Sequence, residues 1–475
     1  MRSNMKKIML VLLVFLGLAA PAAGGLAERI SGIINDPSQK KIRFAVNIIK
    51  ADTGVTVYSH DATKAMTPAS NMKIITSVAA LKYLGPGYEF KTQVGLLNDD
   101  LVIIGSGDPL LADKENDAKY GRAAGWIIDD IVAKLKQQNI TEIGSIIVDS
   151  TIFDNQRVHP NWPPNDLNRW WACEVCGLNF HDNSIEMTVT NIDGRAVINI
   201  EPKTDYVRMV NQVQTISSGS GAVGAYRTPG SPNVLTVKGK CKKQEGPFPV
   251  AIEGPSGFFM FVLAEKIASA GIAVKGQLLE KPVEFNKGFK TIAEYKTPLT
   301  DCLARCNKDS FGLVAESLLK TIAADASGGK GGSWAEGQKL LTNYLVSLGV
   351  SENEFRIDDG SGLSEENKLS ANAITHVLFD VYKGKNWPLY RDSLATAGTD
   401  GTIKKYFNEE PYKGRIFGKT GYISGVKSFS GVCCTDKGDF LFSILTEGDS
   451  GQTRDAINDI VKAIFESACG GLSLI

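Results

Sequence analysis

The stretch that most constrains this chain is Ala69-Ser70-Asn71-Met72-Lys73, where a serine and a lysine stand three residues apart at the start of an expected helix. Residues three apart share one helical face, which brings the lysine amine within reach of the serine hydroxyl. Pro68 precedes the helix, Gly85-Pro86-Gly87 ends it, and apolar residues recur at helical spacing between them. The pattern predicts Ser70 in the first turn, as a nucleophile that Lys73 activates.

The start of this helix also suits an anion. Free backbone N–H groups and the positive end of the helix dipole favour negative charge that develops beside Ser70. The pair alone has a simpler interpretation, because a serine near a helix N-terminus is usually only a cap. A catalytic site therefore also needs a proton relay and a carboxylate anchor from elsewhere in the chain.

The N-terminus has the pattern of a secretory signal peptide. Basic residues precede an apolar run over 8–20, and Ala20-Pro21-Ala22 supplies small residues for cleavage. The run is too short for a good membrane span. We expect residues 1–22 to be removed and the mature protein, without a stable membrane span, to work in the periplasm or another extracytoplasmic space. A retained N-terminal anchor is the alternative.

The amino-acid composition limits which kinds of partner the protein is expected to bind. Lys and Arg number 52, as do Asp and Glu, so the net charge gives no indication of nucleic acid or an anionic membrane surface. An exported location permits disulfides, and Cys173/Cys176 and Cys302/Cys306 are candidates by proximity alone. We favour structural cysteines. No metal is expected, since Cys-x-x-Cys lacks a second half-site and the four histidines are scattered.

The predicted secondary structure changes along the chain. Strand-like runs at 42–49 and 55–58 form a hairpin before the Ser70 helix, and many short strand-like runs between 91 and 279 predict an inserted β-rich module of one or two subdomains. Helices are expected at 258–270, 311–324, 334–348, 371–382 and 454–466, and strands at 415–418, 427–433 and 440–446. The order predicts an α+β catalytic domain in two segments, 23–90 and 280–475, whose antiparallel sheet the N-terminal hairpin completes.

Two later motifs supply the missing parts of a site. In Lys419-Thr420-Gly421, on a strand-like run, the lysine and threonine can face a carboxylate, and the glycine lets a ligand's backbone approach. Ser310 precedes the helix expected at 311–324, where an N-cap role would explain it without chemistry. What favours a catalytic role is the order of the three motifs.

Aromatic residues between these motifs have a simpler interpretation. Trp162, Trp170 and Trp171 could stack sugars, but burial is the commoner fate of tryptophan, and we interpret them as packing residues.

The motif order resembles that of the serine penicillin-recognising enzymes. Within them the chain is similar to the D-Ala-D-Ala carboxypeptidases and endopeptidases of the class C low-molecular-mass penicillin-binding proteins, over nearly all of its mature length. The separation of Ser70 from Ser310, 240 positions, is characteristic of that family. Five further stretches support the resemblance: Gly105-Ser106-Gly107-Asp108-Pro109, Asp149-Ser150-Thr151-Ile152-Phe153, Leu178-Asn179-Phe180-His181-Asp182-Asn183, Asp359-Gly360-Ser361-Gly362-Leu363-Ser364 and Gly398-Thr399-Asp400-Gly401-Thr402.

The resemblance implies a fold and a reaction. The fold would be a transpeptidase-like domain, related to that of β-lactamases, split by β-rich insertions. The substrate would be a peptidoglycan stem peptide ending in D-Ala-D-Ala, or a cross-link, and β-lactam antibiotics would be covalent inhibitors. Ser70 would attack the carbonyl of the penultimate D-Ala, Lys73 would act as the base, and water would hydrolyse the acyl-enzyme. No metal or organic cofactor is required.

The remaining motifs would hold and polarise the substrate. Ser310 would relay a proton to the leaving amine, while Lys419 and Thr420 would bind the terminal carboxylate. The backbone N–H groups of Ser70 and Tyr422 would form the oxyanion hole. Such a mechanism needs Lys73 neutral while Lys419 stays charged, and both burial and a second cation lower the pKa of an amine.

Two positions depart from the family pattern, and one retains it. The middle motif, usually Ser-x-Asn, reads Ser310-Phe311-Gly312, so an amide that contacts substrate and orients the Ser-Lys pair is absent. Glu365 stands where the family often carries an arginine for the stem peptide's diamino acid. Asp166, in a segment that keeps the family pattern, is a candidate for binding a side-chain ammonium.

Three interpretations follow. We favour an active D,D-carboxypeptidase or endopeptidase. Gly312 and Glu365 motivate a second, a catalytically weakened peptidoglycan-binding protein. A β-lactamase or esterase on the same scaffold is the third. The stem-peptide preference, the oligomeric state, and whether Asn307 or Asn367 fills the space beside Gly312 stay open at this point.

Overall fold

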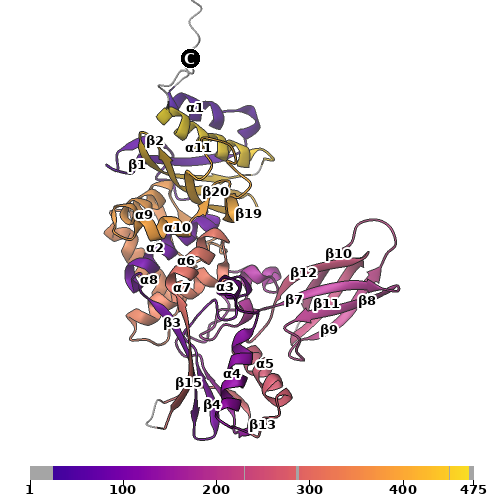
Figure 1. The fold of residues 1–475 in the computed structure, drawn as a ribbon. Coiled ribbons are helices and arrows are strands. Elements are labelled where there is room, and N and C mark those ends of the chain that lie inside the picture. The colour runs from indigo at the N-terminus through magenta and orange to yellow at the C-terminus, as the bar shows by residue number, and fades with distance from the viewer. Residues whose placement is uncertain (1–24, 229, 285–287, 449, 470–475) are drawn as a thin grey trace, which may run out of the picture.

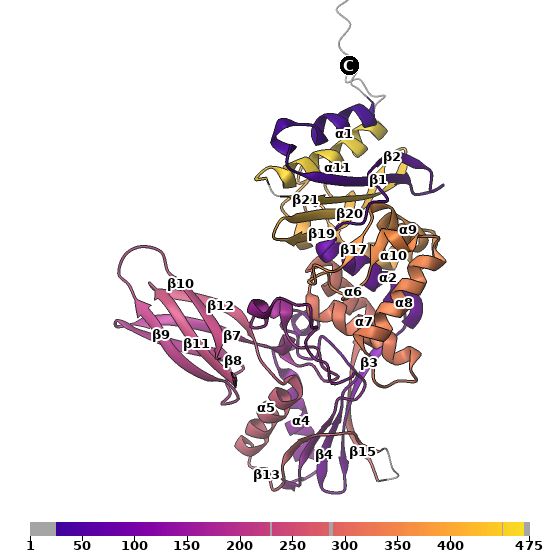
Figure 2. The same cartoon turned by 180° about the vertical axis from the view of Figure 1, so that it is seen from behind.

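The computed structural model describes residues 25–228, 230–284, 288–448 and 450–469. The chain forms an elongated molecule with a sheet and its two helices at one end, a helical layer beneath, and an inserted module at the other end (Figure 1). From this module a separate β-structure projects sideways, as both views show (Figure 2). The predicted signal peptide, residues 1–22, lies outside the described residues.

The catalytic half is built on a six-stranded sheet in the order β18-β19-β20-β21-β1-β2, in which all neighbours are antiparallel. Its strands are β1 (Arg43–Lys50), β2 (Thr56–His60), β18 (Ala395–Thr396), β19 (Ile416–Ile423), β20 (Val426–Thr435) and β21 (Gly438–Glu447). β1 lies between β21 and β2, and its six central residues are all buried. The N-terminal hairpin thus completes a sheet whose other strands come after the insertion, as the sequence predicts.

Helices cover both faces of this sheet. On one face, α1 (Leu26–Ile34) and α11 (Thr453–Cys469) pack on a core that contains Val46, Ile48 and Phe442. On the other face lie α2 (Met72–Leu84), α6 (Leu299–Lys308), α7 (Gly312–Ala326), α8 (Trp334–Ser347), α9 (Ala371–Lys383) and α10 (Trp387–Ser393). Residues 72–81 of α2 are buried all round, as expected of a helix at the centre of a core. The predicted helices are confirmed, with ends that differ from the predicted ones by at most three residues, whereas α1, α6 and α10 were not predicted.

The inserted module contains a mixed five-stranded sheet and a projecting pair of three-stranded sheets. The first has the order β14-β6-β4-β3-β15, and its strands are β3 (Glu89–Leu97), β4 (Asp100–Ile104), β6 (Ile146–Asp149), β14 (Leu278–Glu280) and β15 (Lys290–Pro298). It packs with α4 (Trp126–Gln137) and α5 (Pro255–Ser269) in one core. The projecting sheets are β12-β7-β8 and β10-β11-β9, formed by β7 (Ser184–Ile192), β8 (Arg195–Glu201), β9 (Arg208–Thr215), β10 (Ala222–Thr228), β11 (Ser231–Cys241) and β12 (Gln244–Ala251).

Short elements complete the described chain. They are α3 (Lys114–Lys119), the strands β5 (Glu142–Ile143), β13 (Ala273–Val274), β16 (Phe355–Arg356) and β17 (Lys368–Leu369), and the 3₁₀ turns η1 (Pro37–Gln39), η2 (Ala69–Asn71), η3 (Pro164–Asp166), η4 (Trp170–Ala172), η5 (His181–Asn183), η6 (Glu352–Glu354) and η7 (Gly401–Ile403).

β15 bears on the predicted boundary at residue 280, where we expect the second catalytic segment to start. β15 begins at Lys290 and pairs antiparallel with β3 over Lys290–Pro298. The apolar pattern of β15 does not show which sheet it joins, so its pairing partner was not predictable. We therefore propose that the insertion extends from Glu89 to Pro298.

The four cysteines singled out as disulfide candidates are buried free thiols. Cys173, Cys176, Cys302 and Cys306 are packed in the interior, in agreement with a structural role. Among the described residues, no helix combines the length and hydrophobicity needed to cross a bilayer.

The central position of β1 gives a stability prediction. Ile48 on β1 is fully buried, so we expect Ile48→Ala to lower the free energy of unfolding by about 2–5 kcal/mol through lost burial and a residual cavity. Val55→Ala, at a side chain that is 59% exposed, is the matched control and is expected to change it by less than about 0.5 kcal/mol. Urea denaturation of both variants tests this, and equal effects would contradict the assigned place of β1.

Candidate active site

Ser70 and Lys73 lie on one face at the start of α2, as predicted. Ser70 is the middle residue of the 3₁₀ turn η2, and Lys73 stands in the first turn of α2 directly after it. The Lys73 Nζ donates a hydrogen bond to the Ser70 Oγ at 3.2 Å. It also donates to the main-chain oxygen of Ser361 at 2.7 Å. The amine therefore lies between the serine hydroxyl and a fixed carbonyl.

Ser310 does not act as a helix cap. The N-cap residue of α7 is Phe311, and no side chain caps the helix there. Ser310 instead takes a left-handed conformation with φ of 62°, and its Oγ accepts a hydrogen bond from the Lys419 Nζ at 2.7 Å. The N-cap interpretation is therefore wrong, because the backbone turns one residue before the helix and leaves the hydroxyl free to meet β19.

Lys419-Thr420-Gly421 lies on β19, beside the nucleophile. The fully buried Lys419 Nζ also donates to the Thr420 carbonyl oxygen at 2.7 Å, and Thr420 Oγ1 donates to Thr402 Oγ1 at 2.8 Å. Gly421 approaches the chain itself: a Cβ there would lie 3.0 Å from the backbone nitrogen of Ser70. The glycine thus lets β19 pack against the η2 turn, whereas we expected it to admit the backbone of a ligand.

A second set of polar side chains ties the nucleophile to the sheet. Asn71 Nδ2 donates to the carbonyl oxygen of Lys419 at 2.9 Å, and the Asn71 Oδ1 accepts from Ser430 Oγ at 2.5 Å. Ser428 Oγ donates to the carbonyl of Pro68 at 2.8 Å. Sequence reasoning missed these contacts, although two serines at alternate positions of a buried strand share one face and mark that face as polar.

Burial dominates the electrostatics of both lysines. It lowers the pKa of Lys73, against the opposing negative charges of Glu316 and Asp359. Burial also holds the pKa of Lys419 well below its usual value, and the neighbouring Lys73 lowers it further. A neutral Lys73 was expected, but Lys419 was expected to keep its charge. A carboxylate bound beside Lys419 would favour its charged form again.

A cavity of about 460 Å³ opens in front of these groups. Of the predicted site residues, Ser70, Lys73, Ser310, Tyr422 and Asp166 line it, together with Trp170, Trp171, Gly312, Ser361, Gly362, Leu363, Ile423 and Ser424. Lys419 meets this set through its hydrogen bond to Ser310. The structure thus brings together parts of the sequence that lie before, within and after the insertion.

The wall contributed by the insertion corrects one expectation. Trp162 is buried, as predicted, but Trp171 is 37% exposed and lines the cavity, so it is not only a packing residue. Its Nε1 donates to Asp166 Oδ2 at 3.3 Å, which fixes the carboxylate at the cavity wall.

Gly312 has no vacant space beside it. A Cβ at this position would lie 2.8 Å from the main-chain oxygen of Trp171, too close to be tolerated without movement. Neither candidate asparagine fills the place of a side chain there. Asn307 bonds Ser77 and Ser393, and Asn367 bonds the Asp358–Asp359 turn.

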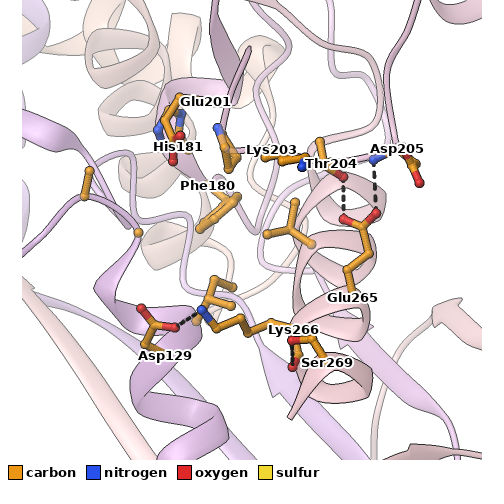
Figure 3. Close-up of a pocket in the computed structure, with 15 residues that line it drawn as sticks. Asp129, Phe180, His181, Glu201, Lys203, Thr204, Asp205, Glu265, Lys266 and Ser269 are labelled. Atoms are coloured by element: carbon orange, nitrogen blue, oxygen red, sulfur yellow. Dashed lines mark hydrogen bonds and ion pairs between the residues drawn. The ribbon is translucent and has the colours of Figure 1, made fainter. Parts of the chain in front are cut away.

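A further cavity, of about 420 Å³, lies in the inserted module between α4, α5 and residues 201–205 (Figure 3). Lys266 forms an ion pair with Asp129 at 2.5 Å. Glu265 accepts hydrogen bonds from Thr204 Oγ1 and from the Asp205 N–H. These charged side chains are thus partnered within the wall of the cavity. None of the predicted site residues lines it.

Comparisons with known proteins agree with this geometry. The chain matches the D-Ala-D-Ala carboxypeptidase 3 (S13) family over residues 26–467. It is 26% identical over 470 residues to a D-alanyl-D-alanine carboxypeptidase of Actinomadura sp. (strain R39), which covers 94% of this chain and 85% of that protein. Over 391 residues it is 25% identical to the D-alanyl-D-alanine carboxypeptidase DacB of Haemophilus influenzae, and the match covers 79% of this chain and 78% of that protein.

Solved structures share the fold. Penicillin-binding protein 4 (dacB) from Haemophilus influenzae superposes with a TM-score of 0.77 at 22% identity and covers 92% of this chain and 98% of that chain. A predatory peptidoglycan endopeptidase of Bdellovibrio bacteriovorus gives a TM-score of 0.51 at 15% identity, and the superposition covers 92% of this chain and 95% of that chain. The predicted α+β class with a β-rich insertion is thereby confirmed, as is the resemblance to penicillin-binding proteins. By its match over residues 26–467, the chain belongs to the D-Ala-D-Ala carboxypeptidase 3 (S13) family.

Proposed function

We propose that the protein is a serine D,D-peptidase that acts on peptidoglycan stem peptides through an acyl-enzyme on Ser70. The observation that carries the proposal is the 3.2 Å hydrogen bond from Lys73 Nζ to Ser70 Oγ, at a cavity that the hydroxyl of Ser310 also lines. Because burial lowers the pKa of Lys73, its amine is better able to accept the serine proton. The Ser70 Oγ attacks the carbonyl carbon of the penultimate D-Ala, terminal D-Ala leaves as an amine, and water then cleaves the ester.

The groups around Ser70 have complementary roles in this proposal. The backbone N–H groups of Ser70 and Tyr422 stabilise the oxyanion, a contribution of about 3–4 kcal/mol per donor in comparable sites. The close contact of Gly421 with the Ser70 backbone supports this role, since it keeps β19 beside the nucleophile. Ser310 passes a proton to the leaving amine, and Lys419 with Thr420 binds the terminal carboxylate of the substrate.

The substrate class is inferred from the family and from the wall of the cavity. Relatives are D-alanyl-D-alanine carboxypeptidases, and the Haemophilus influenzae protein has been solved in complex with a β-lactam. We therefore propose carboxypeptidase or endopeptidase activity and covalent inhibition by β-lactams. Asp166, fixed by Trp171, is suited to bind a side-chain ammonium. Glu365 is exposed and carries no positive charge for a second substrate carboxylate.

The location of the protein follows from the same proposal. Peptidoglycan lies outside the cytoplasmic membrane, so the enzyme has to be exported, which fits the signal-peptide pattern of residues 1–22.

A catalytically weakened binding protein is the second candidate, and Gly312 is the observation that favours it. The turn around Trp171 stands where a side chain at residue 312 would extend, so the amide usual in this family has no equivalent side chain at that position. We favour the active enzyme, because Lys73 has a replacement hydrogen-bond acceptor in Ser361.

Acylation tests the proposed function. Incubation with benzylpenicillin is expected to add one penicilloyl group to the wild type and none to Ser70→Ala, as followed by intact-mass spectrometry over time. Ser59→Ala, at an exposed serine of β2, is the matched control and should acylate like the wild type. A folded wild type without an adduct would favour the binding protein, and an adduct lost within seconds would favour a β-lactamase.

Restoring the family asparagine gives a second prediction. We expect Gly312→Asn to slow acylation by about tenfold or more, because the new side chain must displace the main chain of Trp171 at the cavity wall. Gly32→Asn on α1, where a Cβ would meet nothing within 4 Å, controls for the asparagine itself. Rates of benzylpenicillin acylation decide: a Gly312→Asn variant faster than the wild type would show that the site lacks an amide it needs.

A further inference from the structure

Glu316 is a fully buried carboxylate that the mechanism above does not use. It lies on α7, among apolar residues and two turns after Ser310, and it was not singled out by its sequence. Its Oε1 accepts the N–H of Ser361 at 2.7 Å, and its Oε2 accepts the N–H of Gly360 at 2.9 Å and the Nε1–H of Trp334 at 2.7 Å. Two of its three partners are thus consecutive main-chain groups of the segment that contacts Lys73.

The two backbone groups of Ser361 link Glu316 to the nucleophile. The Ser361 N–H donates to Glu316 and to the Asp359 Oδ1, while the Ser361 carbonyl oxygen, in the next peptide, accepts from Lys73 Nζ at 2.7 Å. Asp359 holds the same turn from the other side through the Gly362 N–H at 2.7 Å. Each peptide is planar, so the direction of the Ser361 carbonyl is fixed by the Gly362 N–H, which Asp359 holds. Glu316 holds the N–H groups of the two peptides that precede this carbonyl, and so fixes the turn from which it projects.

This arrangement explains how Lys73 is oriented although residue 312 is a glycine and not the asparagine usual in the family. A lysine amine that activates a serine must be held by a second acceptor, or it can turn away from the hydroxyl. Residue 312 supplies no side-chain oxygen, whereas the Ser361 carbonyl accepts a hydrogen bond from Lys73, and the Ser361 N–H donates one to the buried Glu316.

We propose that Glu316 is a positioning residue of the Ser70–Lys73 pair: it holds the Ser361 turn so that the Ser361 carbonyl is the second acceptor of Lys73. The inference rests on the proposed function, since it describes how the base of that reaction is oriented. Glu316 does not line the cavity in front of Ser70, and it acts on Lys73 through the Ser361 turn and through its charge.

The charges around the pair predict how the variant titrates. Lys73 is faced by Cys306 from α6, Glu316 from α7, Asp359 from the 359–364 turn and Lys419 from β19. Burial raises the pKa of the Glu316 carboxyl to about 7, with the Asp359 charge adding to this effect, so the acid is ionised above neutrality. When ionised, its negative charge raises the pKa of Lys73 and opposes the effect of burial.

The test is the pH profile of benzylpenicillin acylation for Glu316→Gln. Glutamine has one acceptor oxygen, so it cannot bond Ser361 on one side and Gly360 with Trp334 on the other. We expect the plateau rate to fall by about tenfold or more. Acylation requires neutral Lys73 and declines as pH falls through its pKa, and loss of the Glu316 charge lowers that pKa. The acid limb is therefore expected to move to lower pH, a shift that a purely structural defect would not produce.

Glu354→Gln is the matched control, because Glu354 is also a buried acid but caps the start of α9 through Ser370 and Asn372. It should leave both the plateau and the acid limb unchanged. If Glu316→Gln does not fold by circular dichroism, Trp334→Phe removes one donor to Glu316 and keeps the ring, and it should slow acylation by about threefold.

The outcomes separate the two proposals. A wild type that forms no adduct overturns the proposed function itself. A wild type that acylates while Glu316→Gln matches it in rate and pH profile overturns the role of Glu316 alone. A lower plateau without a shifted limb also overturns it, and reduces Glu316 to a structural residue.

Discussion

The structure depends on a buried amine held between two oxygens. Lys73 Nζ lies 3.2 Å from the Ser70 hydroxyl and 2.7 Å from the Ser361 carbonyl. A lysine without water around it is costly in its charged form, and this cost makes the neutral amine, and hence a base, accessible. The hydrogen bonds direct that amine to one hydroxyl. The surrounding helices and strands bury this amine and hold it in that orientation.

The topology provides both conditions. Residues 72–81 of α2 are buried, and the sheet that supports this helix is closed by β1 against β21, strands from opposite ends of the chain. Gly421 and Asn71 join β19 to the nucleophile turn, so Lys419 and Ser310 are placed relative to Ser70 by the sheet. The inserted module contributes the opposite wall through Trp171 and Asp166. The site therefore requires the catalytic half and the insertion in one folded chain.

Much of this was accessible from the sequence, and the exceptions have physical reasons. The Ser70–Lys73 pair follows from helical periodicity, and the N-terminal hairpin follows from two strand-like runs around a turn. Ser310 was predicted as a proton relay from the order of the motifs, but its left-handed conformation, which excludes the alternative N-cap role, is not encoded in the local sequence. Trp171 and β15 were misplaced since neither exposure at a cavity nor a strand's partner is encoded locally. Glu316 gave a signal that was overlooked, because an acid in the apolar first half of a helix requires polar partners when it is buried.

The most direct measurement of the central claim locates the acyl group. Benzylpenicillin-treated protein is digested, and the modified peptide is sequenced by tandem mass spectrometry. The account predicts a single penicilloyl group on Ser70, beside the amine that removes its proton. A group on Ser310, which hydrogen-bonds the other buried lysine, would exchange the roles of the two serines and contradict the mechanism.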